Sequence, residues 1–80
     1  MYVTEAARGR GIGRTLLQRL IDQAAAITGL EQIWLTVSAE QQAARRLYES
    51  LGFRRFGREP RALRVGGRYL DEEYFVLMLR

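Results

Sequence analysis

The chain has 80 residues and contains neither cysteine nor histidine, which excludes a disulfide, a thiolate metal site and a histidine general base. All thirteen basic residues are arginine, and against nine acids they give a formal net charge of +4. This balance favours acidic partners such as a phosphorylated cofactor or a nucleic acid. The acids do not lie at metal-ligand spacing, so no metal is expected, and no apolar run approaches the ~20 residues that span a membrane. We therefore expect a cytoplasmic protein with one small domain, residues 1–80.

A strand stub at Tyr2-Val3 is followed by a glycine-rich loop. The loop contains Arg8, Gly9, Arg10, Gly11, Ile12 and Gly13. Three glycines in five positions let successive backbone N–H groups point into one concavity. A helix that begins at Arg14 would add the unpaired N–H groups of its first turn and the positive end of its dipole. The loop and the nearby arginines predict a site for a phosphate or pyrophosphate, with a plain tight turn as the alternative interpretation.

Residues 14–28 have the periodicity of an amphipathic helix. Apolar side chains recur at Leu16, Leu20 and Ala24, while polar residues fall between them. Gly29 is expected just past the end of this helix, where a glycine often reverses the chain.

Residues 32–37 are rich in β-branched and aromatic side chains and predict a largely buried strand. Ser38 is expected to cap the next helix, with Gln41 three positions later completing a capping box. The helix should stop at Gly52, where Phe53 is placed for the hydrophobic contact of a Schellman ending.

The last third changes to strand patterns over residues 53–65 and 69–79, joined by the turn Gly66-Gly67. Pro60 places a bulge in the first of these strands or puts it at a sheet edge. The predicted order is strand stub, helix, strand, helix, strand, strand. This is an α/β (α+β) fold with a mixed sheet, because the strand–helix–strand unit implies parallel pairing and the final hairpin is antiparallel.

Three motifs in this order resemble the C-terminal half of a GNAT (GCN5-related) N-acetyltransferase domain. The first is the loop R-G-R-G-I-G at residues 8–13, which fits the R/Q-x-x-G-x-G/A pyrophosphate loop of the family. The second is A-R-R-L-Y-E-S-L-G-F at residues 44–53, close to the A-x-x-L-Y-x-x-x-G-F signature. The third is the C-terminal hairpin, with E-P-R-A-L at residues 59–63 and F-V-L-M-L at residues 75–79. The resemblance covers nearly the whole chain.

The resemblance implies transfer of an acetyl group from acetyl-CoA to an amine by direct attack on the thioester, with backbone donors stabilising the oxyanion. Tyr48 matches the tyrosine that protonates the departing CoA thiolate in many members, although a core aromatic is the alternative role. The implied cofactor-binding residues are Val3, Arg8, Gly9, Arg10, Gly11, Ile12, Gly13, Arg14 and Gln41. Gln41 stands where the family often has asparagine, and Asp71 and Glu72 lie where some members have residues near the substrate, although solvated charge is the simpler interpretation.

A full domain of this family is about twice as long, and the part that usually carries the general base and most of the amine pocket has no counterpart here. The sequence therefore predicts a partial GNAT domain with an exposed sheet edge, and we expect a homo-oligomer that covers this edge. A catalytically incomplete CoA-binding or oligomerisation module is the alternative function. A nucleic-acid binder is disfavoured because the arginines are spread along the chain without stacking motifs. The spacing GxGxG also departs from the GxGxxG of a Rossmann dinucleotide site.

Overall fold

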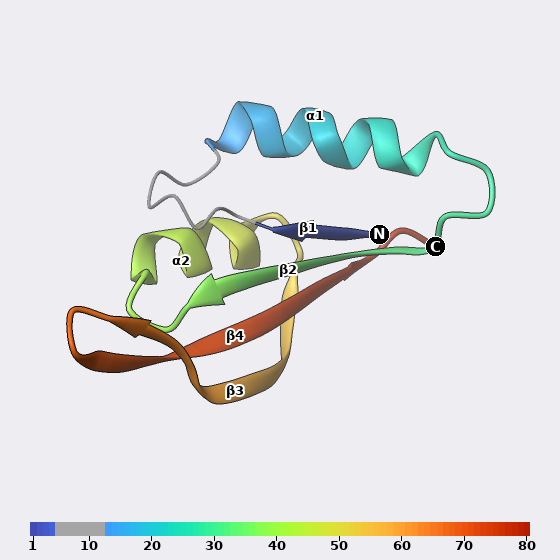
Figure 1. Ribbon diagram of the computed structural model, residues 1–80. Coiled ribbons are helices and arrows are strands. Elements are labelled where there is room, and N and C mark those ends of the chain that lie inside the picture. Colours follow the sequence, from blue (N-terminus) through green and yellow to red (C-terminus); the bar gives the residue numbers. More distant parts are fainter. Residues whose placement is uncertain (5–12) are drawn as a thin grey trace.

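The computed structural model describes residues 1–4 and 13–80, and its elements follow the predicted order (Figure 1). The elements are β1 (Tyr2–Thr4), α1 (Arg14–Ala25), β2 (Gln32–Ser38), α2 (Gln42–Ser50), β3 (Arg54–Val65) and β4 (Arg68–Met78). The four strands form one sheet in the order β1-β2-β4-β3. β1 pairs with β2 in parallel, and the other two pairs are antiparallel, which confirms the predicted mixed sheet. The loop residues Arg8 to Ile12 lie outside the described residues.

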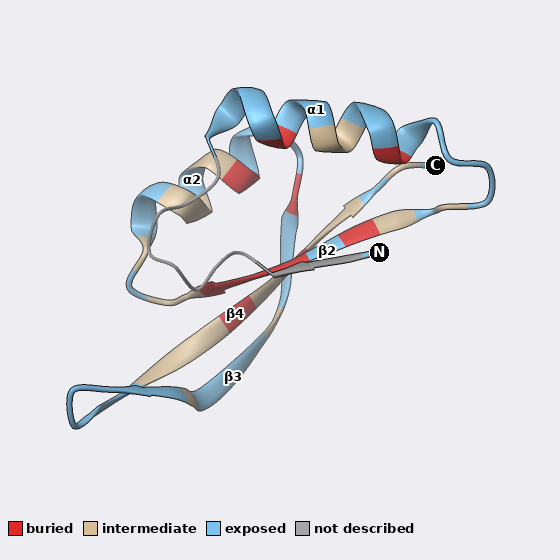
Figure 2. Cartoon of the chain, turned by 45° about the horizontal axis from the view of Figure 1, so that its top comes forward, coloured by how far each residue is buried: buried red, intermediate tan, exposed pale blue. Residues whose placement is uncertain are grey.

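The core lies between the two helices and one face of the sheet (Figure 2). Strand alternation places Ile33, Leu35 and Val37 of β2 on this buried face. The helices contribute Leu17 and Ala24 from α1 and Tyr48 from α2, and Phe53 and Phe75 complete the cluster. Trp34, between two buried residues of β2, stays 40% exposed because it points to the opposite face, over which neither helix packs.

The hairpin confirms the predictions made from its glycines and from Pro60. Gly66 and Gly67 have φ values of 56° and 79°, the pair of positive angles that a tight hairpin turn requires. The register of β3 against β4 shifts between Glu59 and Leu63, so a bulge surrounds Pro60. β3 is also an edge strand of the sheet, where a residue without an N–H group is tolerated.

The Schellman ending of α2 is confirmed as well. Gly52 has a φ of 100°, its N–H donates to the Glu49 carbonyl at 3.1 Å, and the Phe53 N–H donates to the Tyr48 carbonyl at 3.0 Å. These bonds fix the direction in which the chain leaves α2. Phe53 is thereby carried into the core beside Tyr48.

Two helix boundaries differ from the predictions. α1 ends at Ala25, before Thr28, because the N–H groups of Ala26 and Ile27 bond to carbonyls three positions back and tighten the last turn. Gly29, at φ 89°, lies in a separate turn after it. The capping box was also wrong: Ser38 ends β2 and its hydroxyl accepts the Glu40 N–H at 3.3 Å, while Gln41 is the N-cap of α2 and makes no side-chain cap bond. Among the described residues, no helix is long and apolar enough to cross a membrane.

Candidate functional site

The N-terminus of α1 has the chemistry of an anion site. Its first helical hydrogen bond runs from the Leu17 N–H to the Gly13 carbonyl at 3.0 Å, so the three N–H groups of residues 14–16 have no acceptor within the helix. No acid lies in this first turn to neutralise the positive end of the helix dipole. Gly13 is the N-cap, and a Cβ built on it would meet nothing within 4 Å. Among the residues that the structure describes, none therefore crowds the N-cap of this helix.

Arg14 connects this helix end to the second motif. Its guanidinium donates a hydrogen bond to the Ser50 hydroxyl at 2.7 Å, and that hydroxyl donates in turn to the Leu47 carbonyl at 2.7 Å. The start of α1 and the end of α2 are therefore in direct contact, although 36 positions separate Arg14 from Ser50. The first turn of α1 therefore contacts the helix that carries the second motif.

Of the other predicted cofactor residues, the structure describes Val3 and Gln41. The backbone of Val3 lies in β1, in register with Leu35 of β2. Gln41 is partly buried at the start of α2, and its amide is not used as a helix cap. The predictions for Arg8, Gly9, Arg10, Gly11 and Ile12 fall outside the described residues.

Tyr48 is completely buried, with its hydroxyl oxygen also removed from solvent. Its ring packs against Phe53 at 5.9 Å and against Phe75 at 6.0 Å between ring centroids. The core role considered for this tyrosine is therefore present in the structure. A catalytic role would require the reacting sulfur to reach the hydroxyl at the inner side of α2.

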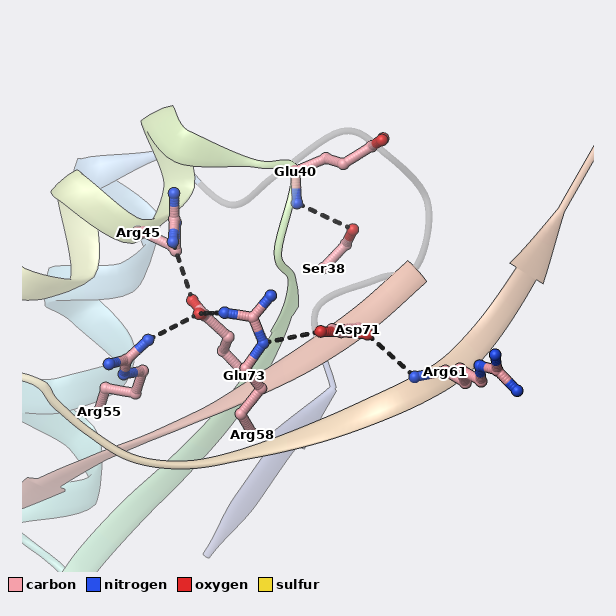
Figure 3. A network of polar contacts seen from close by, with 8 residues as sticks. All are labelled: Ser38, Glu40, Arg45, Arg55, Arg58, Arg61, Asp71 and Glu73. Carbon is pink, nitrogen blue, oxygen red and sulfur yellow. Dashed lines mark hydrogen bonds and ion pairs between the residues drawn. The ribbon is translucent and has the colours of Figure 1, made fainter. Parts of the chain in front are cut away.

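Glu73 is the charged residue whose importance the sequence did not reveal. Its side chain is 0% exposed, and its two carboxylate oxygens accept hydrogen bonds from Arg45 at 3.1 Å and from Arg55 at 2.9 Å, with Arg58 at 3.5 Å (Figure 3). Burial works to raise the pKa of Glu73, but the hydrogen bonds from Arg55 and Arg45 outweigh it and the pKa is lowered. Strand alternation was the available signal, since Glu73 shares a face with the buried Phe75 two positions later.

The neighbouring acids have separate environments. Asp71 accepts the Arg61 N–H at 3.0 Å and the Arg58 side chain at 2.8 Å, and these hydrogen bonds lower its pKa. Asp71 thus stabilises the bulge of β3, in which Arg61 adopts a φ of 55°. Glu72 faces Glu59 across the strand pair, and burial together with this like charge raises the pKa of Glu72.

The comparisons with known proteins agree with this arrangement. Residues 1–53 match the family model described as the acetyltransferase (GNAT) family, and the chain belongs to this family. It is 37% identical over 79 residues to the L-methionine sulfoximine/L-methionine sulfone acetyltransferase of Salmonella typhimurium, covering 99% of this chain and 46% of that protein. It is 45% identical over 65 residues to the N-alpha-acetyltransferase RimI of Mycobacterium tuberculosis, covering 81% of this chain and 39% of that protein.

Solved structures of longer relatives share the fold. The yncA protein of Salmonella typhimurium, solved with its cofactor acetyl-CoA, superposes with a TM-score of 0.80 at 33% identity, over 99% of this chain and 49% of that one. Arabidopsis thaliana NAA60, in complex with a bisubstrate analogue, superposes with a TM-score of 0.82 at 26% identity, over 99% of this chain and 49% of that one. The chain thus spans between 39% and 49% of the length of these four relatives.

Proposed function

We propose that this chain is the acetyl-CoA-binding half of an N-acetyltransferase that transfers an acetyl group to an amine by direct attack. The observation that carries the proposal is the Arg14–Ser50 hydrogen bond at 2.7 Å, because it joins the anion-receiving start of α1 to the helix that bears Tyr48. The acetyl-CoA named for the yncA structure, at a TM-score of 0.80, supports the same cofactor.

The pyrophosphate of acetyl-CoA would be held by the backbone N–H groups at the start of α1 and by the glycine loop before it. These residues are Arg8, Gly9, Arg10, Gly11, Ile12, Gly13 and Arg14. Val3 at the end of β1 would lie beside the pantetheine arm, and the Gln41 amide would hydrogen-bond to the cofactor. Acetyl-CoA supplies an activated thioester, and no metal is required for this chemistry.

Transfer begins when the lone pair of a neutral amine attacks the thioester carbonyl and forms a tetrahedral oxyanion. Collapse of this species breaks the C–S bond and leaves an amide and a thiolate. Tyr48 would protonate the thiolate, since a phenol with a pKa near 10 and a thiol differ little in acidity. The nitrogen must also lose a proton, and no residue of the chain is assigned to take it. The remainder of the amine pocket would come from another polypeptide segment.

The first experiment is calorimetric titration of acetyl-CoA into the purified chain, with a light-scattering mass measured on the same sample. Micromolar binding is the expected result, and a folded protein that binds no acetyl-CoA would contradict the proposal. Tyr48→Phe should retain acetyl-CoA affinity and lower turnover by about 100-fold in an assay with an amine acceptor. If Tyr48→Phe loses acetyl-CoA affinity as strongly as it loses turnover, the tyrosine has a core role instead.

A catalytically incomplete CoA-binding and oligomerisation module is the second candidate, and the exposed aromatic patch favours it. This patch consists of Trp34 and Phe56, whose ring centroids lie 5.2 Å apart, together with Tyr74, 6.0 Å from Phe56. Trp34 is 40% exposed and Phe56 is 50% exposed on the face that carries neither helix. A second copy that covers this face and the sheet edge would make a cytoplasmic homo-oligomer.

Light scattering of Phe56→Ser tests this candidate. A shift to monomer is expected if the patch is the interface. Val65→Ser, at a position of similar exposure (52%) next to the hairpin turn, should leave the mass unchanged. An unchanged mass in Phe56→Ser would place any interface elsewhere. Acetyl transfer by the chain alone would show that the module is catalytically complete.

A further inference from the structure

A second polar site lies between α2 and the hairpin. It is a pocket of about 410 Å³. Its walls are Gln42, Arg45, Arg46, Glu49, Arg55, Glu73 and Phe75. Three arginines face two carboxylates here, and one of these carboxylates, Glu73, is already engaged by Arg45 and Arg55. The pocket therefore retains positive charge after its internal ion pairs are counted.

The hydrogen-bonding capacity of the arginines in this pocket is not fully used by the residues that the structure describes. The Nε of Arg45 is buried and has no hydrogen-bond partner among the described residues, although a buried donor normally has one. Arg45 is also held in place, because one of its terminal nitrogens is hydrogen-bonded to Glu73 at 3.1 Å. Arg46 makes no ion pair with any acid that the structure describes. A guanidinium presents five donors in a planar fork, so most of this capacity is unused.

We propose that this pocket binds a phosphate monoester, held by Arg45, Arg46 and Arg55. A phosphoryl group has three terminal oxygens and carries close to two negative charges, so it can accept charge-assisted hydrogen bonds from three separate guanidinium groups. The ring of Phe75 at the wall gives an apolar surface for the body of the ligand. This site goes beyond the proposed acetyl-CoA site, because none of the residues assigned to that site lines the pocket, and its occupant is a second ligand.

Inorganic phosphate is the probe, and the Nε–Hε resonance of Arg45 is the readout in a nuclear magnetic resonance titration at constant ionic strength. A saturable shift of this resonance is expected with phosphate and not with chloride. Absence of a saturable shift up to about 50 mM phosphate would overturn the proposal. An equal shift with chloride would also overturn the proposal, since the pocket would then attract anions without selecting phosphate.

Arg46→Gln is the variant of choice because Arg46, unlike Arg45 and Arg55, does not neutralise the buried Glu73. This substitution should weaken phosphate binding about tenfold, since it removes one of the charged donors that hold the phosphate dianion. Arg19→Gln, an exposed position on α1, is the matched control with the same change in net charge and should bind phosphate as the parent does. Glu49→Gln should strengthen binding, because it removes a negative charge from the wall. Equal weakening in Arg46→Gln and Arg19→Gln would contradict the site.

The 3′-phosphate of CoA is the alternative source of the same chemistry, and a comparison of CoA with dephospho-CoA distinguishes it. The proposal expects Arg46→Gln to bind both molecules as tightly as the parent. If the variant loses affinity for CoA alone, the pocket belongs to the cofactor and the proposal of a second ligand fails. This outcome would leave the proposed acetyl-CoA function intact, so the two proposals can fail separately.

Discussion

Arg14 donates a hydrogen bond to Ser50 at 2.7 Å and so joins the first turn of α1 to the last turn of α2. Both residues are exposed, so the bond contributes about 1 kcal/mol or less to stability. Its greater effect should be to fix the direction of the Arg14 guanidinium next to the N-cap residue Gly13. Under the proposed function, we expect this bond to affect acetyl-CoA binding more than it affects stability.

Ser50→Ala tests this interpretation. We expect a fall in acetyl-CoA affinity of about threefold, because Arg14 loses its partner and samples more rotamers, with a change in the unfolding free energy below about 1 kcal/mol. Calorimetry and thermal unfolding measure the two quantities. Thr15→Ala, at an exposed neighbouring position of α1, is the control. A loss of stability without a change in affinity would mean that the bond is purely structural.

Gly13 and Gly52 form a matched pair for a glycine-to-alanine comparison. Gly52→Ala should destabilise the protein by about 1–2 kcal/mol, since its φ is 100° and the new Cβ would lie 3.2 Å from the Leu77 Cδ1 atom. Gly13→Ala should change stability by less than about 1 kcal/mol, because its φ is −68° and a Cβ there meets nothing within 4 Å.

The effects of the two alanine variants on acetyl-CoA binding should be ranked in the opposite order to their effects on stability. Gly13→Ala should weaken this binding by about tenfold or more, because the methyl group enters the space in front of the helix donors. Gly52→Ala should leave the affinity of the folded protein almost unchanged. Chemical denaturation and calorimetry on both variants provide the measurements, and normal acetyl-CoA binding by Gly13→Ala would argue against a pyrophosphate at this helix end.

Glu73 should make the unfolding free energy of the protein depend on pH. Its pKa in the folded protein lies below the ordinary value of 4.5, so its contribution is fully present above that pH and is lost as the pH falls through the folded-state pKa. Glu73→Gln should lower the unfolding free energy by about 2 kcal/mol at pH 7, less than for a fully buried pair because Arg45 and Arg55 can be partly rehydrated. Urea denaturation across pH 3–7 should show this difference shrinking toward acid. If the stability difference between the parent and Glu73→Gln does not change with pH, the ionised Glu73 carboxylate is not the source of the stabilisation.

Glu72 should behave in the opposite way. Burial and the nearby Glu59 raise its pKa, so the folded protein binds the proton more tightly and the unfavourable contribution of Glu72 fades as the pH falls. Glu72→Gln should therefore stabilise the protein at pH 7 by about 0.5 kcal/mol, the scale of a like-charge pair across two strands. The same series of urea denaturations measures it, and destabilisation by Glu72→Gln at pH 7 would be the contrary result.

The sequence by itself determined the order of the elements, the hairpin and the Schellman ending. These features depend on local chemistry: Gly66, Gly67 and Gly52 occupy positions that need a positive φ, and Pro60 cannot complete a strand ladder. Local pattern was less reliable at helix ends. Ser38 had the right spacing for a capping box, yet strand pairing with Glu72 extended β2 through it and moved the helix start to Gln42.

Only the tertiary structure decided which distant side chains meet. Spacing along the chain says nothing of the contact between Arg14 and Ser50, because the two lie on different helices whose packing sets their separation. Glu73 stands in a run of three acids that resembles a solvated segment, but the pleat of β4 turns it toward α2 and away from water. A buried carboxylate must then find positive partners, and the fold supplies them from α2 and β3, two elements that become neighbours only when the hairpin folds back on the sheet.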